Sequence, residues 1–197
     1  MTERVLFQRS HFKVRWVDDG DTILLEDGRH VRYIGIDSPE IGNASAPGEP
    51  FGKEALLFNR NRVLHQRVKL EQDVEKKDRY GRVLAYVFLP DNTFMNLQMV
   101  ESGHAVVRYQ KPNIRFHSML LDAQRKAMAS KKGIWSAFQE DGGIRYTGNR
   151  NSMRFHKMDC PLGKKISAGN RIGFKSRWDA FWEGYSPCRE CFQIPAQ

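Results

Sequence analysis

Three carboxylates stand at the ends of a predicted β-hairpin. Residues 17–40 read VDDGDTILLEDGRHVRYIGIDSPE, with Asp21 ahead of the first strand, Arg32 inside the second, and Asp37 and Glu40 after it. Carboxylate oxygens that meet in space suit a hard divalent cation such as Ca²⁺ or Mg²⁺. Isolated acids in turns commonly only shape the turn, so this stretch alone leaves both interpretations open.

The spacing of Arg32 and Asp37 sets a geometric condition for such a site. In a regular strand alternate side chains point to opposite faces, and a spacing of five residues would separate these two. Their convergence therefore requires a bend, and Gly35 is the residue that can supply it.

A second stretch carries the charge that a phosphate ligand requires. Residues 77–88 read KDRYGRVLAYVF and place Arg79, Tyr80 and Arg82 in a turn ahead of a strand. Guanidinium groups match phosphate oxygens in pairs and stay charged, so Arg32 and Arg82 near a metal site would hold a phosphodiester from both sides. The alternative is a surface charge pair between Arg82 and Asp78.

The third candidate site lies near the carboxyl end and contains all three cysteines of the chain. The pattern H-x₃-C followed by C-x₂-C gives two close pairs of nitrogen and sulfur ligands, as tetrahedral zinc requires: His156, Cys160, Cys188 and Cys191. The alternative is three buried thiols and a surface histidine. Ser186-Pro187, a turn-forming pair before the C-x₂-C, favours zinc.

The elements that must position these residues follow from the hydrophobic pattern. Strands are expected at 12–17, 22–26, 31–36, 68–74 and 83–89, with Asp27-Gly28 as a two-residue hairpin turn. Helices are expected at 52–64, at 96–102 and from an Asn113 cap to Gly133. Five short strands with three helices predict an α+β domain built on a small barrel.

Charge and composition divide the chain and suggest its partner. We expect a barrel domain at 10–137, a linker at 138–145, where FQEDGGIR loses periodicity, and a second unit at 146–192. The 197 residues hold 32 Lys or Arg against 23 Asp or Glu, a net charge of +9, which favours a nucleic-acid partner. The alternative is a merely basic surface. No stretch is long enough to cross a bilayer, so no membrane partner is expected.

The ordered motifs resemble the staphylococcal nuclease (thermonuclease) family. VDDGDT, RYIGIDSPE, FGKEA, KDRYGRVLAYVF, GHAVVRYQKPN and GIW follow in the family's order over about residues 12–136. The resemblance implies a five-stranded OB-fold barrel with three helices, and hydrolysis of DNA and RNA phosphodiesters with Ca²⁺ at the P–O5′ bond, leaving 3′-phosphates.

The resemblance also implies roles for individual residues. Asp21 and Asp37 match calcium-binding carboxylates, and Ser38 stands where a backbone carbonyl completes the calcium site. Glu40 matches the general base toward water, and Arg32 and Arg82 match the arginines that clamp the phosphate. The substrate-binding positions hold Tyr80 near the phosphate, Arg79 in place of a lysine, and Arg108 beside Tyr109 where the family often has a base-stacking tyrosine.

A second resemblance covers residues 146–192. RFHKMDCP and FKSRWDAFWEGYSPCREC are similar to the zinc-binding domain of the Ada DNA-repair protein and its relatives. In Ada the first zinc ligand is a cysteine that accepts methyl groups, whereas this chain has His156, so we expect no methyl transfer. We expect instead a structural Zn²⁺ in a small α/β module whose basic residues contact phosphates without reading sequence.

Together these expectations predict a calcium-dependent endonuclease that acts on DNA and is aided by a basic zinc module. Whether it also acts on RNA stays open at this point. The alternatives are a non-enzymatic nucleic-acid-binding protein on an inactive nuclease barrel, and an alkyl-damage repair protein. The amino terminus lacks a secretory signal, which favours a cytoplasmic location, with secretion of a trimmed precursor as the alternative. The sequence leaves the oligomeric state undetermined.

Overall fold

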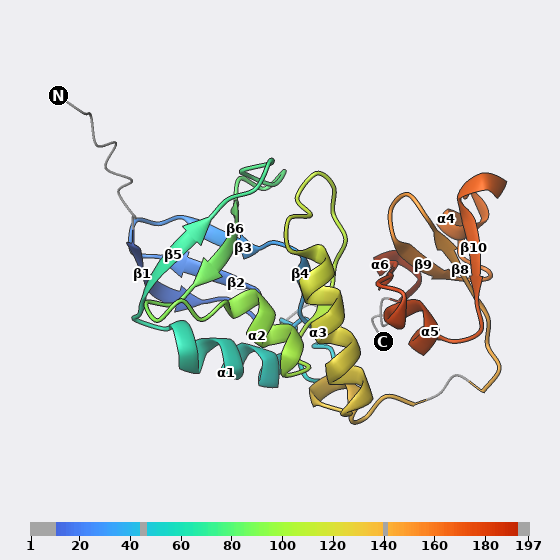
Figure 1. Ribbon diagram of the computed structural model, residues 1–197, viewed down its shortest axis with the longest axis horizontal. Helices are drawn as coiled ribbons and strands as arrows, with labels where there is room; N and C mark the ends of the chain where they lie inside the picture. The colour runs from blue at the N-terminus through green and yellow to red at the C-terminus, as the bar shows by residue number, and fades with distance from the viewer. Residues whose placement is uncertain (1–10, 44–46, 140–141, 193–197) are drawn as a thin grey trace.

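A closed five-stranded barrel forms the amino-terminal half of the protein (Figure 1). The computed structural model describes residues 11–43, 47–139 and 142–192. Around the barrel the strands run β1 (His11–Val17), β2 (Thr22–Leu25), β3 (His30–Tyr33), β6 (Val83–Phe88) and β5 (Arg67–Glu71). Strands β3 and β6 are parallel, and every other pair is antiparallel. The predicted α+β fold with a five-stranded OB-fold barrel is confirmed.

The hairpin between β2 and β3 differs from its prediction at both ends. Leu25 N donates to Arg29 O at 3.0 Å, so the turn holds three residues and the predicted two-residue turn at Asp27-Gly28 is wrong. The cause lies in β1, because Glu26 N donates to Lys13 O instead of across the hairpin. The predicted strand at 31–36 is also broken: β3 ends at Tyr33, and a separate β4 (Ile36–Asp37) pairs with β7 (Val106–Val107).

Three helices pack against the barrel, as the sequence predicts. They are α1 (Gly52–Val63), α2 (Met95–Glu101) and α3 (His117–Ala129), followed by a 3₁₀ turn, η1 (Gly133–Trp135). The predicted Asn113 cap of α3 is wrong, since the helix begins four residues later. Asn113 instead binds the backbone of Glu75 through both ends of its amide, with Oδ1 accepting from Glu75 N at 2.8 Å and Nδ2 donating to Glu75 O at 3.0 Å.

The main core lies inside the barrel and beneath the helices. Apolar side chains that alternate along the strands meet Ala55 of α1, Met95 and Met99 of α2 and Leu120 of α3, all with no exposed surface. Full burial of each large apolar side chain contributes about 1.5–3 kcal/mol relative to exposure. This core holds the strand ends that carry the candidate site in fixed positions.

A second, smaller sheet lies beyond α3. Its strands run in the order β10 (Arg171–Phe174), β8 (Tyr146–Asn149), β9 (Arg154–Lys157) and β11 (Ser186–Pro187). Short helical segments connect and flank them: α4 (Pro161–Lys164), η2 (Ala168–Asn170), α5 (Arg177–Trp182) and α6 (Arg189–Phe192). The predicted small α/β module therefore forms after the barrel.

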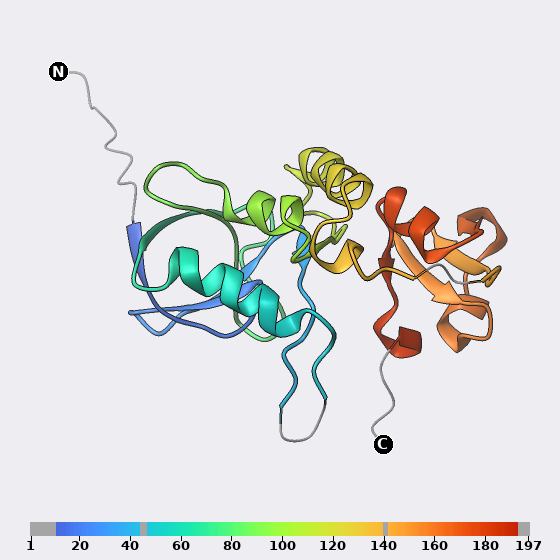
Figure 2. The same cartoon turned by 90° about the horizontal axis from the view of Figure 1, so that it is seen from below.

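Helix α3 joins the two sheets. In both views it lies between the barrel and the second sheet (Figures 1 and 2). Ala127, Met128 and Trp135 share one hydrophobic cluster with Phe155 and Phe181 of the second unit. The predicted boundaries at 10–137, 138–145 and 146–192 stay predictions, and residues 10, 140 and 141 lie outside the described residues. In the part of the chain that the structure describes, no helix has the length and apolar character to span a membrane.

Candidate active site

Arg32 lies at the centre of the acidic residues predicted from the sequence. Its Nε is 2.9 Å from Asp21 Oδ1, and its Nη2 is 2.5 Å from Asp37 Oδ1. Its Nη1 donates to the backbone carbonyls of Tyr33 and Ile36, which fixes the plane of the guanidinium. The arginine is only 6% exposed. The hairpin thus brings one arginine and two carboxylates together across the end of the barrel.

The two carboxylates are held by neighbouring backbone. Asp21 Oδ2 accepts the amide of Ser38 at 2.7 Å, while the carbonyl of Asp21 accepts from Tyr33 N. Asp37 belongs to β4, whose register places it opposite Val106 of β7. These bonds cross-link the start of β2 to the segment after β3. Ser38 therefore lies beside Asp21, and the bond that the structure shows uses its amide nitrogen. The predicted role of its backbone carbonyl in a calcium site stays a prediction.

The charge state of the pair follows from burial and neighbouring charges. Burial raises the pKa of Asp21 to about 7, with Asp19 and Asp37 adding to the rise and Arg32 opposing it. Burial also acts to raise the pKa of Asp37, but Arg32, Arg108 and other arginines outweigh it and hold that pKa below its usual range. Two buried acids facing one another favour the approach of a further cation.

Glu40 shares with Asp37 a contact to Arg189, a residue that the sequence did not suggest. Its Oε1 is 3.3 Å from Arg189 Nη2, and the same Nη2 is 3.0 Å from Asp37 Oδ1. Burial raises the pKa of Glu40, and Arg189 opposes that rise. Within the described residues, Glu40 does not complete a compact set of three ligand atoms with Asp21 and Asp37.

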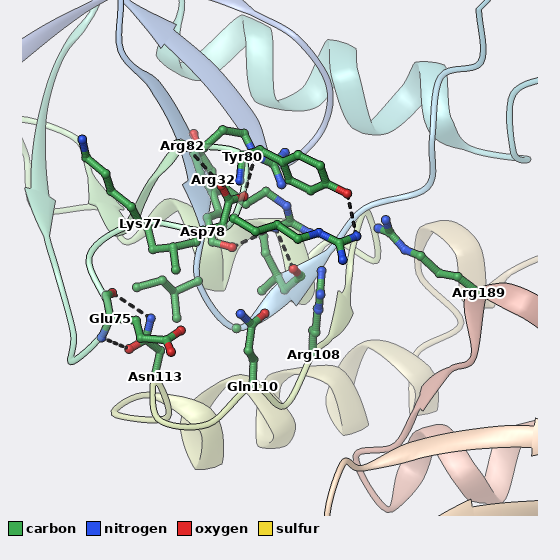
Figure 3. Close-up of a pocket in the computed structure, with 16 residues that line it drawn as sticks. Arg32, Glu75, Lys77, Asp78, Tyr80, Arg82, Arg108, Gln110, Asn113 and Arg189 are labelled. Atoms are coloured by element: carbon green, nitrogen blue, oxygen red, sulfur yellow. Dashed lines mark hydrogen bonds and ion pairs between the residues drawn. The ribbon is translucent and has the colours of Figure 1, made fainter. Parts of the chain in front are cut away.

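Arg32 and Arg82 share one cavity of about 490 Å³ (Figure 3). Arg82 also pairs with Asp78, its Nε lying 2.8 Å from Asp78 Oδ2. The surface charge pair considered from the sequence thus exists, and its arginine still lines the cavity. The other basic or hydrogen-bonding residues of the wall include Lys77, Arg79, Tyr80, Arg108, Gln110 and Arg189. This collection of cations around one hollow suits an anionic ligand.

Arg79 and Tyr80 form the exposed rim of this cavity. Arg79 Nη2 donates to the Tyr80 hydroxyl at 2.6 Å, and Tyr80 is 69% exposed. The guanidiniums of both Arg79 and Arg82 lie over the Tyr80 ring, 4.8 and 5.6 Å from its centre. Both residues line the cavity, and their predicted role in substrate binding stays a prediction.

Arg108 and Tyr109 lead away from the first cavity into a second hollow of about 340 Å³. Arg108 Nη1 is 3.4 Å from Asp37 Oδ1, and burial lowers the pKa of Arg108 to about 10. Tyr109 lines the second hollow, where Lys111 and Arg154 are its basic neighbours, and its ring packs edge-on against His117. This hollow lies between the barrel side and the second sheet.

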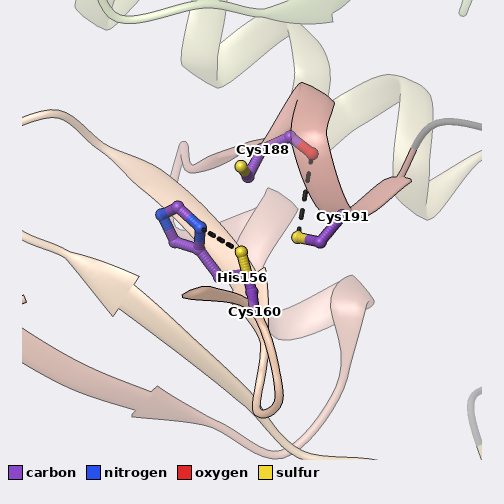
Figure 4. Close-up of side chains that lie close together, drawn as sticks. All are labelled: His156, Cys160, Cys188 and Cys191. Carbon is purple, nitrogen blue, oxygen red and sulfur yellow. Dashed lines mark hydrogen bonds between the residues drawn. The ribbon is translucent and has the colours of Figure 1, made fainter. Parts of the chain in front are cut away.

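The four predicted zinc ligands come together in space (Figure 4). The ligand atoms of His156, Cys160, Cys188 and Cys191 all lie within 4.8 Å of one another. His156 Nδ1 is 3.4 Å from Cys160 Sγ. Strand β9 supplies the histidine, the turn before α4 supplies Cys160, Cys188 directly precedes α6, and Cys191 lies within α6. Three thiols with one imidazole match the donor set of a structural zinc site.

The thiols of this cluster differ in how readily they ionise. Burial acts to raise the pKa of Cys160, but the backbone amides of Gly163 and Leu162 stabilise its thiolate and lower the pKa. Burial raises the pKa of Cys191 to about 12. Metal binding requires thiolates, so a cation at this cluster must displace protons.

The basic and aromatic residues of the second unit divide between surface and core. Phe174 and Phe181 are buried in the second hydrophobic cluster and Trp178 packs against it, so these side chains form part of the core of the second unit. Trp182 is 37% exposed, with the Arg125 guanidinium over its ring. Of the module's arginines, Arg154 and Arg189 line the hollows next to the barrel. Apart from its place inside the C-x₂-C pair, Arg189 has no feature in the sequence that distinguishes it from the other arginines.

Comparisons with known proteins agree with this geometry. The family model described as staphylococcal nuclease homologue matches residues 30–137. The thermonuclease of Staphylococcus hyicus is 41% identical over 128 residues, covering 64% of this chain and 75% of that protein. The endonuclease YncB of Bacillus subtilis is 32% identical over 123 residues, covering 60% of this chain and 58% of that protein.

One relative extends the similarity further along the chain. The probable endonuclease LCL3 of Coccidioides posadasii is 34% identical over 165 residues, covering 78% of this chain and 51% of that protein. The family match spans more than half of the chain and includes Arg32, Asp37, Glu40 and Arg82. The chain belongs to the family of staphylococcal nuclease homologues.

Proposed function

We propose that this protein is a calcium-dependent nuclease that hydrolyses the P–O5′ bond of DNA and leaves 3′-phosphates, with RNA as a further substrate class. The observation that carries the proposal is the shared cavity of Arg32 and Arg82, with Arg32 bonded behind it to Asp21 and Asp37. The names of the relatives, a thermonuclease and two endonucleases, support the same reaction.

The acidic residues fit a hard cation. Asp21 and Asp37 offer only oxygen ligands, and burial together with Asp19 and Asp37 raises the pKa of Asp21 to about 7, which a bound cation would relieve. Asp21 and Asp37 would hold Ca²⁺, with Ser38 beside them. When bound, the cation supplies electrostatic stabilisation for the charge that develops on the phosphate oxygens.

The protein groups around this centre supply the remaining chemistry. Attack of water on the phosphorus forms a new P–O bond while the P–O5′ bond breaks, and negative charge grows on the equatorial oxygens. Arg32 and Arg82 stabilise that charge more in the transition state than in the ground state. Glu40, which is half-exposed, accepts the proton that the water loses. A positioned base of this kind contributes about 10²- to 10⁴-fold to the rate.

The second unit contributes basic surface next to the cavity. We propose that Zn²⁺ on His156, Cys160, Cys188 and Cys191 stabilises this unit, in which a short sheet has a limited core of its own. The hollow between Arg108, Lys111 and Arg154 then continues the cationic path from the phosphate cavity toward the second sheet. A nucleic-acid strand along this path would gain affinity through phosphate contacts.

A nicking assay tests the proposed activity. Supercoiled plasmid and labelled single-stranded DNA and RNA are incubated with Ca²⁺ or with excess chelator, and product ends are mapped by susceptibility to a 3′-phosphatase. We expect cleavage only with Ca²⁺, with 3′-phosphate ends, and its loss in Glu40→Gln and Arg82→Ala. Binding without cleavage under every divalent ion would favour the alternative, a nucleic-acid-binding protein on an inactive nuclease barrel.

A further inference from the structure

Arg189 lies where two cavities meet. It is part of the wall of the phosphate cavity that Arg32 and Arg82 line. It also lines a neighbouring cavity of about 300 Å³ that contains Asp37 and Glu40. The carboxyl-terminal unit contributes Phe181, Pro187 and Phe192 to the wall of this cavity of about 300 Å³. Figure 3 shows the Arg189 side chain reaching toward the phosphate cavity from the carboxyl-terminal part of the chain.

The guanidinium of Arg189 contacts the carboxylates assigned to metal binding and proton transfer. Nη2 is 3.0 Å from Asp37 Oδ1 and 3.3 Å from Glu40 Oε1. Arg32 and Arg108 approach the same oxygen of Asp37, but both belong to the barrel side. The side chains of Arg189 and Glu40 are 57% and 54% exposed, so solvent screens their contact and another cation can displace it.

The cysteine and histidine cluster determines where Arg189 stands. Arg189 follows Cys188 directly and lies two residues before Cys191. The amide of Cys188 donates to Phe155 O at 2.9 Å, which ties the start of α6 to β9, next to His156. With all four ligand atoms within 4.8 Å, a metal ion on the cluster would fix both ends of the turn that carries Arg189.

We propose that Arg189 is a tethered cation that competes with the divalent metal for Asp37 and Glu40, and that zinc in the cluster holds it there. The proposal rests on the calcium-dependent activity proposed above. One guanidinium and one divalent cation carry like charge and share Asp37 Oδ1 as a partner. Metal binding at the acidic centre must therefore displace Arg189 or bear its repulsion.

Two metal sites joined in this way are coupled, and the coupling is reciprocal. Zinc in the cluster lowers the affinity of the acidic centre for Ca²⁺, and Ca²⁺ lowers the affinity of the cluster for zinc by the same factor. Arg189 is the residue through which the two sites act on one another. The nuclease centre would then bind calcium fully only where calcium is abundant.

Calcium binding to the full-length, zinc-loaded protein tests the first half of the proposal without any assay of activity. Isothermal titration calorimetry compares the parent protein with Arg189→Ala, Arg189→Lys and Arg150→Ala. Arg150 is the matched control, an exposed arginine after β8 whose removal changes the net charge equally. We expect the Kd for Ca²⁺ to fall on the order of tenfold in Arg189→Ala, as removal of one unit charge close to a divalent cation predicts. Arg189→Lys should keep most of the competition and Arg150→Ala all of it.

Zinc retention tests the second half. The rate at which a chromophoric chelator removes zinc is measured with and without Ca²⁺, after a thermal melt has shown that each variant is folded. Ca²⁺ should speed zinc release from the parent protein and leave Arg189→Ala unaffected. An unchanged or weaker affinity for Ca²⁺ in Arg189→Ala would overturn the coupling while leaving the calcium site intact. Absence of Ca²⁺ binding in both proteins would overturn the proposed calcium dependence and the coupling with it.

Discussion

Arg32 Nη2 lies 2.5 Å from Asp37 Oδ1, although a regular strand would place these residues on opposite faces. The chain departs from a regular strand at Gly35, whose φ of 80° ends the path of β3 and redirects the backbone into β4. Arg108 N donates to the Gly35 carbonyl at 2.9 Å and holds the bend. The ion pair at the centre of the site therefore depends on a backbone conformation that favours glycine.

Substitution of Gly35 should damage the site beyond its cost in stability. Gly35→Ala forces a Cβ to within 2.8 Å of Leu120 Cδ1 in a positive-φ conformation, and we expect a loss of about 1–2 kcal/mol with at least tenfold lower kcat. Gly28→Ala is the matched control, because Gly28 has a φ of 86° and nothing lies within 4 Å of its added Cβ. Urea unfolding and nuclease assays measure both; equal activities in the two variants would contradict this role of the bend.

Substitution of Arg32 and substitution of Arg82 should both reduce activity but should differ in their effect on stability. Arg32→Ala leaves buried Asp21 and Asp37 without their main partner, and we expect about 3–5 kcal/mol of destabilisation together with loss of activity. Among the described residues Arg82 forms an ion pair with Asp78 near the surface, so Arg82→Ala should cost less than about 1 kcal/mol.

Activity should nevertheless fall in Arg82→Ala. By analogy with the loss of one oxyanion donor, we expect a decrease of about 10²-fold in kcat/KM. Chemical denaturation and initial-rate kinetics on the same preparations give both quantities. A fully active Arg82→Ala would place the phosphate elsewhere.

The sequence predicted most elements and the members of each cluster, but not the contacts between distant segments. The barrel strands follow from alternating apolar residues, and the zinc cluster follows from ligand spacing, because both signals are local. The odd spacing of Arg32 and Asp37 along the strand required a bend between them, and the structure has this bend at Gly35. Asn113 was misassigned because its polar amide fits a helix cap equally well as a bond to the Glu75 backbone.

Arg189 and Gln124 were missed for a different reason. Arg189 reaches residues about 150 positions earlier in the chain, and only the packing of the second unit against α3 brings them together. A basic residue between two cysteines has no local pattern that distinguishes it from the other arginines. In the sequence Gln124 resembles an ordinary helix residue, because its two hydrogen-bond partners, Val107 N and Phe181 O, belong to other elements.

Gln124 should be essential to the attachment of the second unit. Its Nε2 donates to Phe181 O at 2.6 Å, and its Oε1 accepts from Val107 N at 2.7 Å, in the strand that pairs with β4. Gln124→Leu removes the side-chain partner of the buried Val107 amide, whereas Phe181 O still accepts from Gly184 N at 3.0 Å, for a predicted cost of about 1–3 kcal/mol. Gln98→Ala, in α2, is the control and should change stability by less than about 0.5 kcal/mol. Thermal unfolding measures both; equal midpoints would show that this bridge contributes little.

Acid should destabilise the fold partly through His104. Burial lowers the pKa of His104, with Arg62 adding to the effect and Glu54 opposing it, and its Nδ1 has no hydrogen-bond partner among the described residues. Because the unfolded chain binds this proton more readily, the contribution of His104 to the free energy of unfolding should fall as the pH drops below about 6.5, whereas the raised pKa of Asp21 acts in the opposite direction.

His104→Phe should flatten this dependence. The ring packs 4.4 Å from Phe58, and phenylalanine preserves that contact. Urea midpoints at several pH values between 5 and 8 measure the slope for both proteins. A smaller slope should remain in His104→Phe, because burial also lowers the pKa of His117. An identical slope in the two proteins would assign the acid sensitivity to other groups.

Removal of the cluster metal should unfold the second unit and leave the barrel folded. The second cluster of apolar residues, which includes Phe155, Phe174 and Tyr185, is separate from the barrel core. Strand β9 and helix α6 carry two of the four ligands, His156 and Cys191, and Cys188 directly precedes α6. We expect one Zn²⁺ per chain by elemental analysis, as for structural sites whose binding contributes on the order of 10 kcal/mol to folding.

When zinc is chelated or Cys188 is replaced by serine, the second unit should already be unfolded at low temperature, and heating should show the transition of the barrel alone. The indole of Trp135 lies 5.9 Å from that of Trp178 and 5.2 Å from the Phe181 ring, so tryptophan fluorescence reports the loss of the second unit. Far-UV circular dichroism follows the barrel and its helices in parallel. Ala127 and Met128 of α3 and Trp135 of η1 pack in the second hydrophobic cluster, so its loss should also lower the temperature of the barrel transition. An unshifted barrel transition would show that α3 does not couple the two units.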